Sequence, residues 1–503
     1  MFQHVYRILR LSLALAVIVA GMPGVARADD STPESPAAGE NLVFLPFVNN
    51  RSWTGTTTNY PPLARAVNVP YIADLLDGSG SIQRLPSMAI FWYGQVLNTQ
   101  NYTDVRIATN ATHLVVYVSS FDRNTWYNKT PASEALTLWD SATVYLRTSG
   151  QGNGIDGNSY RFTVQLNNGD VVAPAGKLSE RGTGGAWSPA SVAFDAFAAW
   201  RGANVNNADD DRGWVITFKI PFSSLGVSRP VDGAPTWALA VVSHDRDNGG
   251  VQPDTYWPET FQPSNADSWG GVRWGQPTYT PAAVASAGSV LIKQGVNGVT
   301  VPDADLGGVA ANQCSGDTNF MWNQWGITNY GNEPNLNVQN QSDVADWPCF
   351  AKTYLTFPLN QVPAGKIIRS ATLQLYQFGG SGSASNGQTP ADAYIQVFRV
   401  SADWGEGTVT WNNAPVPVEN YGGSWVGQVV GCGAPGGIPW PCVRRDWDVT
   451  RLVAESYALG LPARIGLYSG DSDYSTGKYF TSSEAGDWNI AGRPGLVIDW
   501  GNP

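Results

Sequence analysis

The chain has 503 residues and a formal net charge of −11, and charged residues make up 14% of it. Nucleic acids and anionic lipid surfaces both require a basic face, so this charge argues against either partner. The length exceeds what one hydrophobic core usually organises and indicates two or three domains. The many glycines, prolines and aromatic residues favour short strands joined by turns over long helices.

The first residues have the order of a secretory signal peptide. Arg7 and Arg10 precede the apolar run LSLALAVIVAG, and Ala26–Ala28 have the small-x-small form that signal peptidase cuts. The apolar run is short for a membrane span. We therefore expect residues 1–28 to be removed, leaving a mature chain that starts at Asp29, has no membrane span, and is secreted to the extracellular space or the cell surface.

Residues 29–58 are rich in Ser, Thr, Pro, Asn and Gly, a composition that predicts a flexible leader. From about residue 59 the hydrophobic pattern has a period of two, the period of a half-buried strand. In WVITFKIPF the apolar positions alternate along one face: Trp214, Ile216, Phe218 and Ile220.

A break near residues 276–288 precedes a second set of strand-like segments. The one segment with a helical period is VTRLVAESYALG. We therefore predict an all-β fold of two β-sandwich (jelly-roll-like) domains in tandem after the signal peptide, covering residues 59–280 and 281–503.

All four cysteines lie in the second half of the chain, and an even number in an exported protein predicts disulfides. Pairing of nearest neighbours gives Cys314–Cys349 and Cys432–Cys442. The second pair would close the Gly- and Pro-rich loop CGAPGGIPWPC. The paired CxxC spacings of a zinc site do not occur in the sequence.

Residues 85–275 contain six pieces in the order found in family 9 carbohydrate-binding modules and related DOMON-like sandwiches: IFWYGQV, DVRIATNATHLVVYVSSFD, WDSATVYLRTSG, GWVITFKIPFSSLG, APTWALAVVSHDRDNGG, and YWPETF with SWGGVRW. The segment resembles these modules, in which two tryptophans enclose a terminal sugar beside polar residues and structural calcium. By motif position, the resemblance implies that Trp139 and Trp257 are these tryptophans, with Asp245 and Arg161 as polar groups at the rim.

Two flat rings suit a pyranose because its C–H faces are apolar, while its hydroxyl groups need polar partners. This chain departs from the family at two positions. The family often has an acid where this chain has Val144, and the family's Arg aligns with Thr163, two residues from Arg161. The alternative interpretation is that both tryptophans are core residues.

The loop DRDNGGVQPD follows a buried strand and carries Asp245, Asp247 and Asp254. Carboxylate and amide oxygens on a bendable, Gly-rich loop suit calcium, so we expect these three residues to bind structural Ca²⁺. The loop lacks the full twelve-residue calcium-loop pattern, and the alternative is a solvated acidic turn.

Residues 289–502 resemble a second family, on the pieces TNYGNEPNLNV, YLTFPLNQVPAGKIIRSATLQLY, VFRVSADWGEGTVTWNNAP, DWDVTRLV and KYFTSSEAGDWNIAGRPGLVIDW. This is the DNRLRE family, also described as family 96 carbohydrate-binding modules. Its members are secreted or surface β-sandwiches of polysaccharide-degrading or cell-envelope proteins, and some bind acidic polysaccharide. The resemblance implies that the second half is also a glycan-related sandwich.

The signature stretch WGEGTVTWNNAP holds one acid, Glu406. Residues 408–410 favour a pleated surface and Asn412 with Asn413 a turn, so we expect Trp411 to pack in the fold. We expect the Glu406 carboxylate to accept backbone N–H bonds. A catalytic role is the alternative, but a lone acid without a partner supplies no mechanism.

The sequence predicts no catalytic residue. His113 and His244, the histidines outside the signal peptide, are interpreted as structural, and no nucleophile motif occurs. The predicted function is a secreted, non-catalytic protein that binds polysaccharide or cell-envelope glycan through two sandwich modules. Two alternatives stay open: a glycan depolymerase or lyase with its site in the C-terminal half, and a structural envelope protein without a sugar site.

Overall fold

The computed structural model describes these parts of the chain: residues 56–57, 65–202, 204–247, 253–307, 322–340, 350–382, 387, 389–400, 402–471 and 475–503. The predicted signal peptide, nearly all of the predicted leader and the predicted Cys314–Cys349 pair lie outside the described residues. Residues 51–503 form one compact unit. Among the described residues, no helix is long and apolar enough to cross a membrane.

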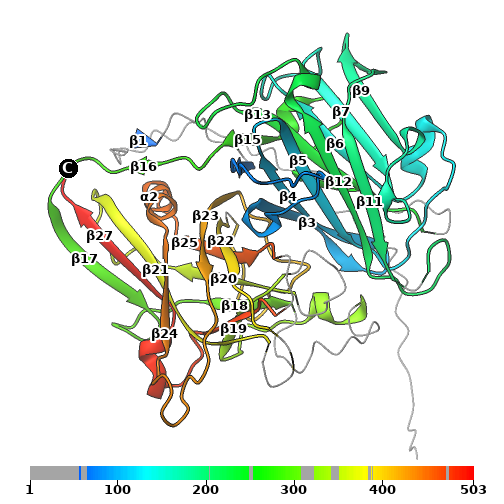
Figure 1. Cartoon of the computed structure of the whole chain (residues 1–503). Helices are drawn as coiled ribbons and strands as arrows, with labels where there is room; N and C mark the ends of the chain where they lie inside the picture. Colours follow the sequence, from blue (N-terminus) through cyan, green and yellow to red (C-terminus); the bar gives the residue numbers. More distant parts are fainter. Residues whose placement is uncertain are drawn as a thin grey trace, which may run out of the picture. The chain divides into compact units, whose positions relative to one another are not determined.

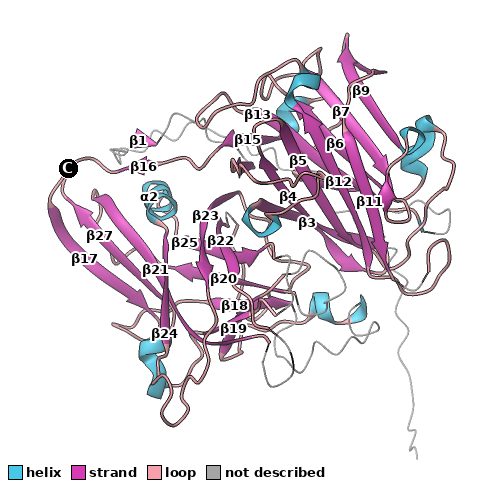
Figure 2. Cartoon of the chain, viewed as in Figure 1, coloured by secondary structure: helices cyan, strands magenta, loops and turns pink. Residues whose placement is uncertain are grey.

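The fold is all-β, as predicted, and its strands form four large sheets (Figures 1 and 2). Sheet 1 contains, in spatial order, β10 (Ala186–Pro189), β9 (Lys177–Thr183), β7 (Ser159–Gln165), β6 (Ser141–Arg147), β13 (Trp237–His244), β15 (Gly270–Trp274) and β2 (Ala66–Val69), with β14 (Thr255–Trp257) beside β13. Sheet 2 contains β3 (Ala89–Leu97), β4 (Gln100–Thr109), β5 (His113–Phe121), β12 (Gly213–Pro221), β11 (Asp195–Arg201) and β8 (Asp170–Val171).

Sheet 3 contains β18 (Asp303–Gly307), β20 (Ala351–Phe357), β25 (Ala463–Ser469), β22 (Ala393–Arg399) and β23 (Glu419–Val426). Sheet 4 contains β17 (Ser286–Lys293), β27 (Gly495–Gly501), β21 (Ile367–Gly380), β26 (Lys478–Thr481) and β19 (Asn335–Val338), with β24 (Val443–Asp448) beside β21. A short ribbon pairs β1 (Thr56–Thr57) with β16 (Tyr279–Thr280). The segment with a helical period forms α2 (Thr450–Leu459), which ends at Gly460 in the left-handed region.

Each pair of sheets encloses an apolar core. The alternation seen in WVITFKIPF places its apolar face in the core between sheets 1 and 2, because Trp214, Ile216, Phe218 and Ile220 are all fully buried. A second core lies between sheets 3 and 4. All strands of sheets 1 and 2 precede residue 281 and all strands of sheets 3 and 4 follow it. The two domains with that boundary stay a prediction, because the residues on both sides share one compact unit.

Sheets 2 and 3 pack against each other through a third apolar cluster. Strand β3 is buried on both faces, so that Phe91 and Tyr93 enter the first core while Ile90 and Trp92 point toward sheet 3. The cluster on the side of sheet 3 includes Leu306, Trp325, Tyr354, Phe398, Trp411 and Tyr468. Trp411 therefore packs in the fold, as the signature stretch predicted.

A buried carboxylate also joins the two halves. Glu419 of β23 pairs with Arg273 of β15 at 2.7 Å and with Arg451 of α2 at 2.5 Å. Its Oε1 also accepts a hydrogen bond from the Asn68 side chain of β2 at 2.7 Å. The carboxylate and both guanidinium groups are almost inaccessible to water, so each charge depends on the others.

We expect Glu419→Gln to reduce the free energy of unfolding by about 3–5 kcal/mol at neutral pH, because it removes the buried carboxylate that Arg273 and Arg451 share. Arg451 keeps only its longer contact with Glu455, at 3.3 Å. Burial raises the pKa of Glu419, but Arg451 and Arg273 outweigh this effect, so the pKa lies below its usual value. A group with a lowered folded-state pKa contributes stability above its unfolded pKa and loses it as the pH falls through the folded value.

The free energy of unfolding can be measured by urea denaturation of wild type and Glu419→Gln. The difference between the two should therefore be largest at neutral pH and should shrink below about pH 4. Glu259→Gln is the matched control, since it breaks an ion pair with Arg65 in which the glutamate is half exposed. That change should cost at most about 1 kcal/mol. If the loss in unfolding free energy caused by Glu419→Gln were the same at acidic and neutral pH, the stabilising role of the Glu419 charge would be contradicted.

Candidate functional site

Three aspartates from distant parts of the chain meet at one end of the first sandwich. Asp122 follows β5, and Asp245 and Asp247 follow β13. One carboxylate oxygen from each lies within 4.8 Å of the others, and we call these three residues the aspartate cluster. Asp140, which precedes β6, is a fourth buried acid close enough to affect them.

Hydrogen bonds hold these acids in place. The Asp122 carboxylate accepts hydrogen bonds from the Trp214 indole N–H at 2.9 Å and from the Asn124 backbone N–H at 3.0 Å. Asp140 accepts backbone N–H bonds from Trp126 at 2.6 Å and from Arg246 at 2.9 Å. In contrast, the buried Oδ1 atom of Asp245 has no hydrogen-bond partner in the described part of the chain.

Burial and mutual repulsion raise the pKa of these acids. The pKa values of Asp122 and Asp140 lie well above the usual range, first because of burial and then because of the neighbouring carboxylates. Burial and the Asp247 carboxylate raise the pKa of Asp245 to about 7. An oxygen-only set of carboxylates with an unpartnered buried oxygen fits the ligand chemistry of calcium.

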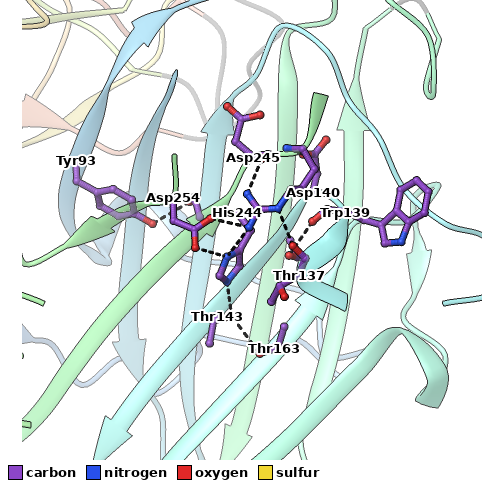
Figure 3. Close-up of polar contacts among 12 residues, drawn as sticks. Tyr93, Thr137, Trp139, Asp140, Thr143, Thr163, His244, Asp245 and Asp254 are labelled. Carbon is purple, nitrogen blue, oxygen red and sulfur yellow. Dashed lines mark hydrogen bonds and ion pairs between the residues drawn. The ribbon is translucent and has the colours of Figure 1, made fainter. Parts of the chain in front are cut away.

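Asp254, the third predicted calcium ligand, does not join the aspartate cluster. Figure 3 shows its carboxylate turned toward His244, whose Nδ1 lies 2.9 Å away, and Arg246 pairs with the same carboxylate at 2.8 Å. The structure therefore separates Asp254 from Asp245 and Asp247, because His244 and Arg246, at the end of the preceding strand, pair with its carboxylate. Asp122 stands in its place.

The contacts of His244 follow the order of a catalytic triad. Its Nε2 lies 2.8 Å from the Thr143 hydroxyl and its Nδ1 faces Asp254. Thr143 is only 1% exposed, however, and its hydroxyl also bonds to the buried Thr163 at 3.0 Å. A substrate carbonyl cannot reach a hydroxyl in that position, so these contacts give no route to nucleophilic catalysis.

Trp257 lies in the core of the first sandwich. It is 1% exposed, its ring centroid is 4.3 Å from that of Phe91, and Gly270 lies so close under the ring that a Cβ there would be 2.3 Å from it. A ring enclosed in this way presents no face to a sugar. The structure therefore does not place Trp257 where the predicted sugar-stacking pair requires it.

The other predicted sugar contacts do not converge either. Trp139 is half-buried at the end of η2 (Ser133–Leu138), and its ring points away from Asp245 and His244 (Figure 3). Arg161 pairs with Glu180 at 2.5 Å and lies over the Trp187 ring. The structure thus distributes Trp139, Trp257, Asp245 and Arg161 over separate environments.

We expect Trp257→Ala to reduce the free energy of unfolding by about 3–5 kcal/mol, because it removes a fully buried ring from a close-packed core. Trp139→Ala is the matched control and should cost much less, since the ring is half-buried. Chemical denaturation of both variants measures the difference. Equal, small losses would contradict the assignment of Trp257 to the core.

The second sandwich carries an exposed set of rings that the sequence reasoning missed. Phe378 of β21, Tyr479 of β26, Trp440, and Trp488 of η10 (Asp487–Gly492) form a continuous series of contacts, which we call the aromatic surface. Trp440 is 42% exposed and Trp488 is 71% exposed. Their ring centroids are 5.2 Å apart with nearly perpendicular planes, and Phe378 lies 6.1 Å from Trp440 and 6.3 Å from Tyr479.

Local sequence explains how these rings reach solvent. Along β21 the inward Leu373 and Leu375 alternate with outward positions that include Phe378, so the ring stands on the outer face of sheet 4. The predicted disulfide between Cys432 and Cys442 is present and closes the loop that carries Trp440. The signal in the sequence was the tryptophan inside CGAPGGIPWPC, a loop whose closure keeps the ring outside any core.

The chain is similar to carbohydrate-binding modules in two comparisons with known proteins. Residues 315–498 match the model of carbohydrate-binding module family 96, which confirms the second resemblance over that range. Similar solved structures include a carbohydrate-binding module of family 9 from Caldicellulosiruptor kristjanssonii in complex with cellotriose, at 14% identity and a TM-score of 0.30, covering 42% of this chain and 94% of that chain. A family 9 module from the same organism in complex with glucose has 13% identity and a TM-score of 0.30, covering 42% of this chain and 97% of that chain. No curated protein matches the chain.

The chain is therefore an all-β protein of stacked sandwiches. Its C-terminal part carries a match to a carbohydrate-binding module family.

Proposed function

We propose that this protein is exported and binds a polysaccharide or cell-envelope glycan without altering it. The observation that carries this proposal is the aromatic surface of the second sandwich, where Trp440 and Trp488 remain exposed. Large exposed rings are costly in water, so a contiguous set of them on a folded protein marks a binding surface. The rings offer flat apolar faces to the C–H groups of sugar residues.

The match of residues 315–498 to carbohydrate-binding module family 96 supports a sugar as the ligand. The net charge of −11 favours an uncharged glycan over a strongly acidic one. Binding through ring stacking should depend weakly on salt, because screening acts on charges rather than on apolar contacts.

Two further features belong to the same proposal. The aspartate cluster would hold a calcium ion that stabilises the first sandwich. The non-catalytic role is part of the proposal, and it is supported by Glu406, the acid of the signature stretch, which accepts the Asp303 backbone N–H at 2.8 Å as a structural acid does.

We expect Trp440→Ala and Trp488→Ala each to weaken glycan binding at least tenfold, because each removes a stacking ring worth about 1.5 kcal/mol or more. The melting temperature should change little, since exposed rings contribute little to a core. The measurement is calorimetric titration with a polysaccharide that the wild type binds, at low and high salt.

Trp425→Ala is the matched control for this experiment. Trp425 is 55% exposed on β23, and its ring contacts Tyr394 rather than a ring of the aromatic surface. Its substitution should leave the affinity unchanged. Unchanged affinity in both Trp440→Ala and Trp488→Ala would contradict the proposed site, and release of shorter chains or unsaturated products from the polysaccharide would contradict a non-catalytic role.

Export makes a separate prediction about the mature chain. Arg7 and Arg10, the apolar run and Ala26–Ala28 have the order that signal peptidase processes. The intact mass of the secreted protein should correspond to a chain that starts at Asp29. A mass that still includes residues 1–28 would contradict cleavage.

A further inference from the structure

Three acidic side chains from separate segments meet in the second sandwich, away from the aspartate cluster of the first. Asp303 is the first residue of β18, Glu406 lies in the signature stretch after β22, and Glu484 follows β26. One carboxylate oxygen from each lies within 4.8 Å of the other two. We call these residues the Asp303 cluster.

The Asp303 carboxylate is fully buried, and one of its two oxygens lacks a hydrogen-bond donor in the described part of the chain. The residue is 0% exposed, and its Oδ2 accepts a hydrogen bond from the Ser483 backbone N–H at 2.8 Å. Its other oxygen, Oδ1, is buried without a hydrogen-bond partner in the described part of the chain. A buried carboxylate oxygen without a donor is costly, so its presence indicates a ligand that completes it.

The two glutamates bring further negative charge to the same point. Glu406 Oε1 accepts the Asp303 backbone N–H at 2.8 Å, which leaves its second oxygen available. Glu484 accepts a hydrogen bond from the adjacent Ser483 hydroxyl at 3.2 Å. Within the described ranges, none of the three acids forms an ion pair with an arginine, lysine or histidine.

We propose that the Asp303 cluster binds a divalent cation, and that the ion is Ca²⁺. Three carboxylates within 4.8 Å repel one another strongly when one of them is buried, and a divalent cation converts this repulsion into attraction. The ligands are all oxygens, without histidine or thiolate, a set that selects hard cations over zinc or copper. Calcium tolerates irregular oxygen geometry and accepts water and backbone carbonyls as its remaining ligands, whereas Mg²⁺ demands near-ideal octahedral geometry.

A cation at this point would fix the signature stretch between the two halves of the chain. On one side, the Asn329 side chain donates to the carbonyls of Glu406 and Val409, both at 2.7 Å. On the other side, the Asn412 side chain bonds to the backbone of Val96 in the first sandwich, at 2.8 and 3.0 Å. The ion would therefore stabilise the loop that carries Trp411 into the layer between sheets 2 and 3. This role is independent of glycan binding.

The test uses the full chain in an Asp245→Asn background, so that the aspartate cluster does not contribute. The protein is stripped with EDTA, and bound Ca²⁺ is counted by equilibrium dialysis and by calorimetric titration, with Mg²⁺ titrated in parallel. We expect one Ca²⁺ per chain, with a Kd in the range of about 10⁻⁵ to 10⁻³ M, weaker Mg²⁺ binding, and a higher melting temperature with calcium.

Adding Glu406→Gln and Glu484→Gln to that background should remove this bound ion and the calcium-dependent rise in melting temperature. Glu333→Gln is the matched control, since it removes the same charge from an exposed glutamate outside the cluster and should leave both unchanged. Because Glu406→Gln also alters a bond to the backbone, Glu484→Gln alone is a second test, with an expected loss of roughly tenfold or more in affinity.

Absence of bound Ca²⁺ up to about 10 mM in the Asp245→Asn chain, well above the range of extracellular calcium sites, would overturn the proposal. That result would mean that shared protons, rather than a cation, neutralise the carboxylates of the Asp303 cluster. The same stoichiometry and affinity in the folded Glu484→Gln chain would also overturn it. Tighter binding of Mg²⁺ than of Ca²⁺ would overturn the assignment of the ion.

Discussion

The aromatic side chains of sheets 2 and 3 pack against each other, and this buried layer decides which surfaces of the chain stay available. Strand β3 contributes to the first core with one face and to the shared cluster with the other. Each sandwich thus gives up one of its outer faces, so the outer faces of sheets 1 and 4 are the broad sheet surfaces left. The aromatic surface lies on the second of these, over β21 and β26.

The same layer contains charges that a purely apolar interface would lack. The Lys352 ammonium lies 3.7 Å from the centroid of the Trp411 ring and 4.6 Å from that of Trp92, and burial lowers its pKa well below the usual value. The Asp104–Arg106 ion pair, at 2.7 Å, is buried beside it. The Asn340 side chain donates to Asp104 across the layer at 3.3 Å, and Lys352 interacts electrostatically with the same carboxylate. Buried charges of this kind add little net stability, but a shift of one sandwich against the other would break these contacts and is therefore penalised. We infer that they fix how the two sandwiches meet.

The strands and the fold class could be predicted from the sequence because they depend on local alternation. Trp214 and Ile220 show this, since both take the buried positions that a period of two assigns. The role of each tryptophan could not be predicted in the same way. Trp257 and Trp440 both precede a proline, but Trp257 lies over Gly270 against Phe91, whereas Trp440 lies on a disulfide-closed loop. Residues far away in the sequence decide whether each tryptophan is buried or exposed. A flat, apolar ring suits both a protein core and a sugar-binding surface.

The sequence did not predict the full membership of the two acidic clusters, again because the residues that meet are far apart along the chain. Asp245 and Asp247 were recognised because they share a loop, but their partner Asp122 lies on another strand end, and Asp254 in the same loop pairs with His244 instead. Glu406 looked like a lone acid because Asp303 and Glu484 come from segments far away in the chain. Sequence spacing can identify acidic residues that share one loop. The acidic residues from distant segments come close to them only through the order of the strands in the folded sheets.

The central claim is that this chain binds glycan through a surface left free by the packing of its two sandwiches. A glycan array probed with the full chain, with calcium and with chelator, tests it most directly. The account predicts retention of the folded chain on at least one uncharged polysaccharide, at low and at high salt, both with calcium and with chelator. Absence of retention on any glycan by the folded, calcium-loaded chain would contradict it and would favour a structural envelope protein without a sugar site.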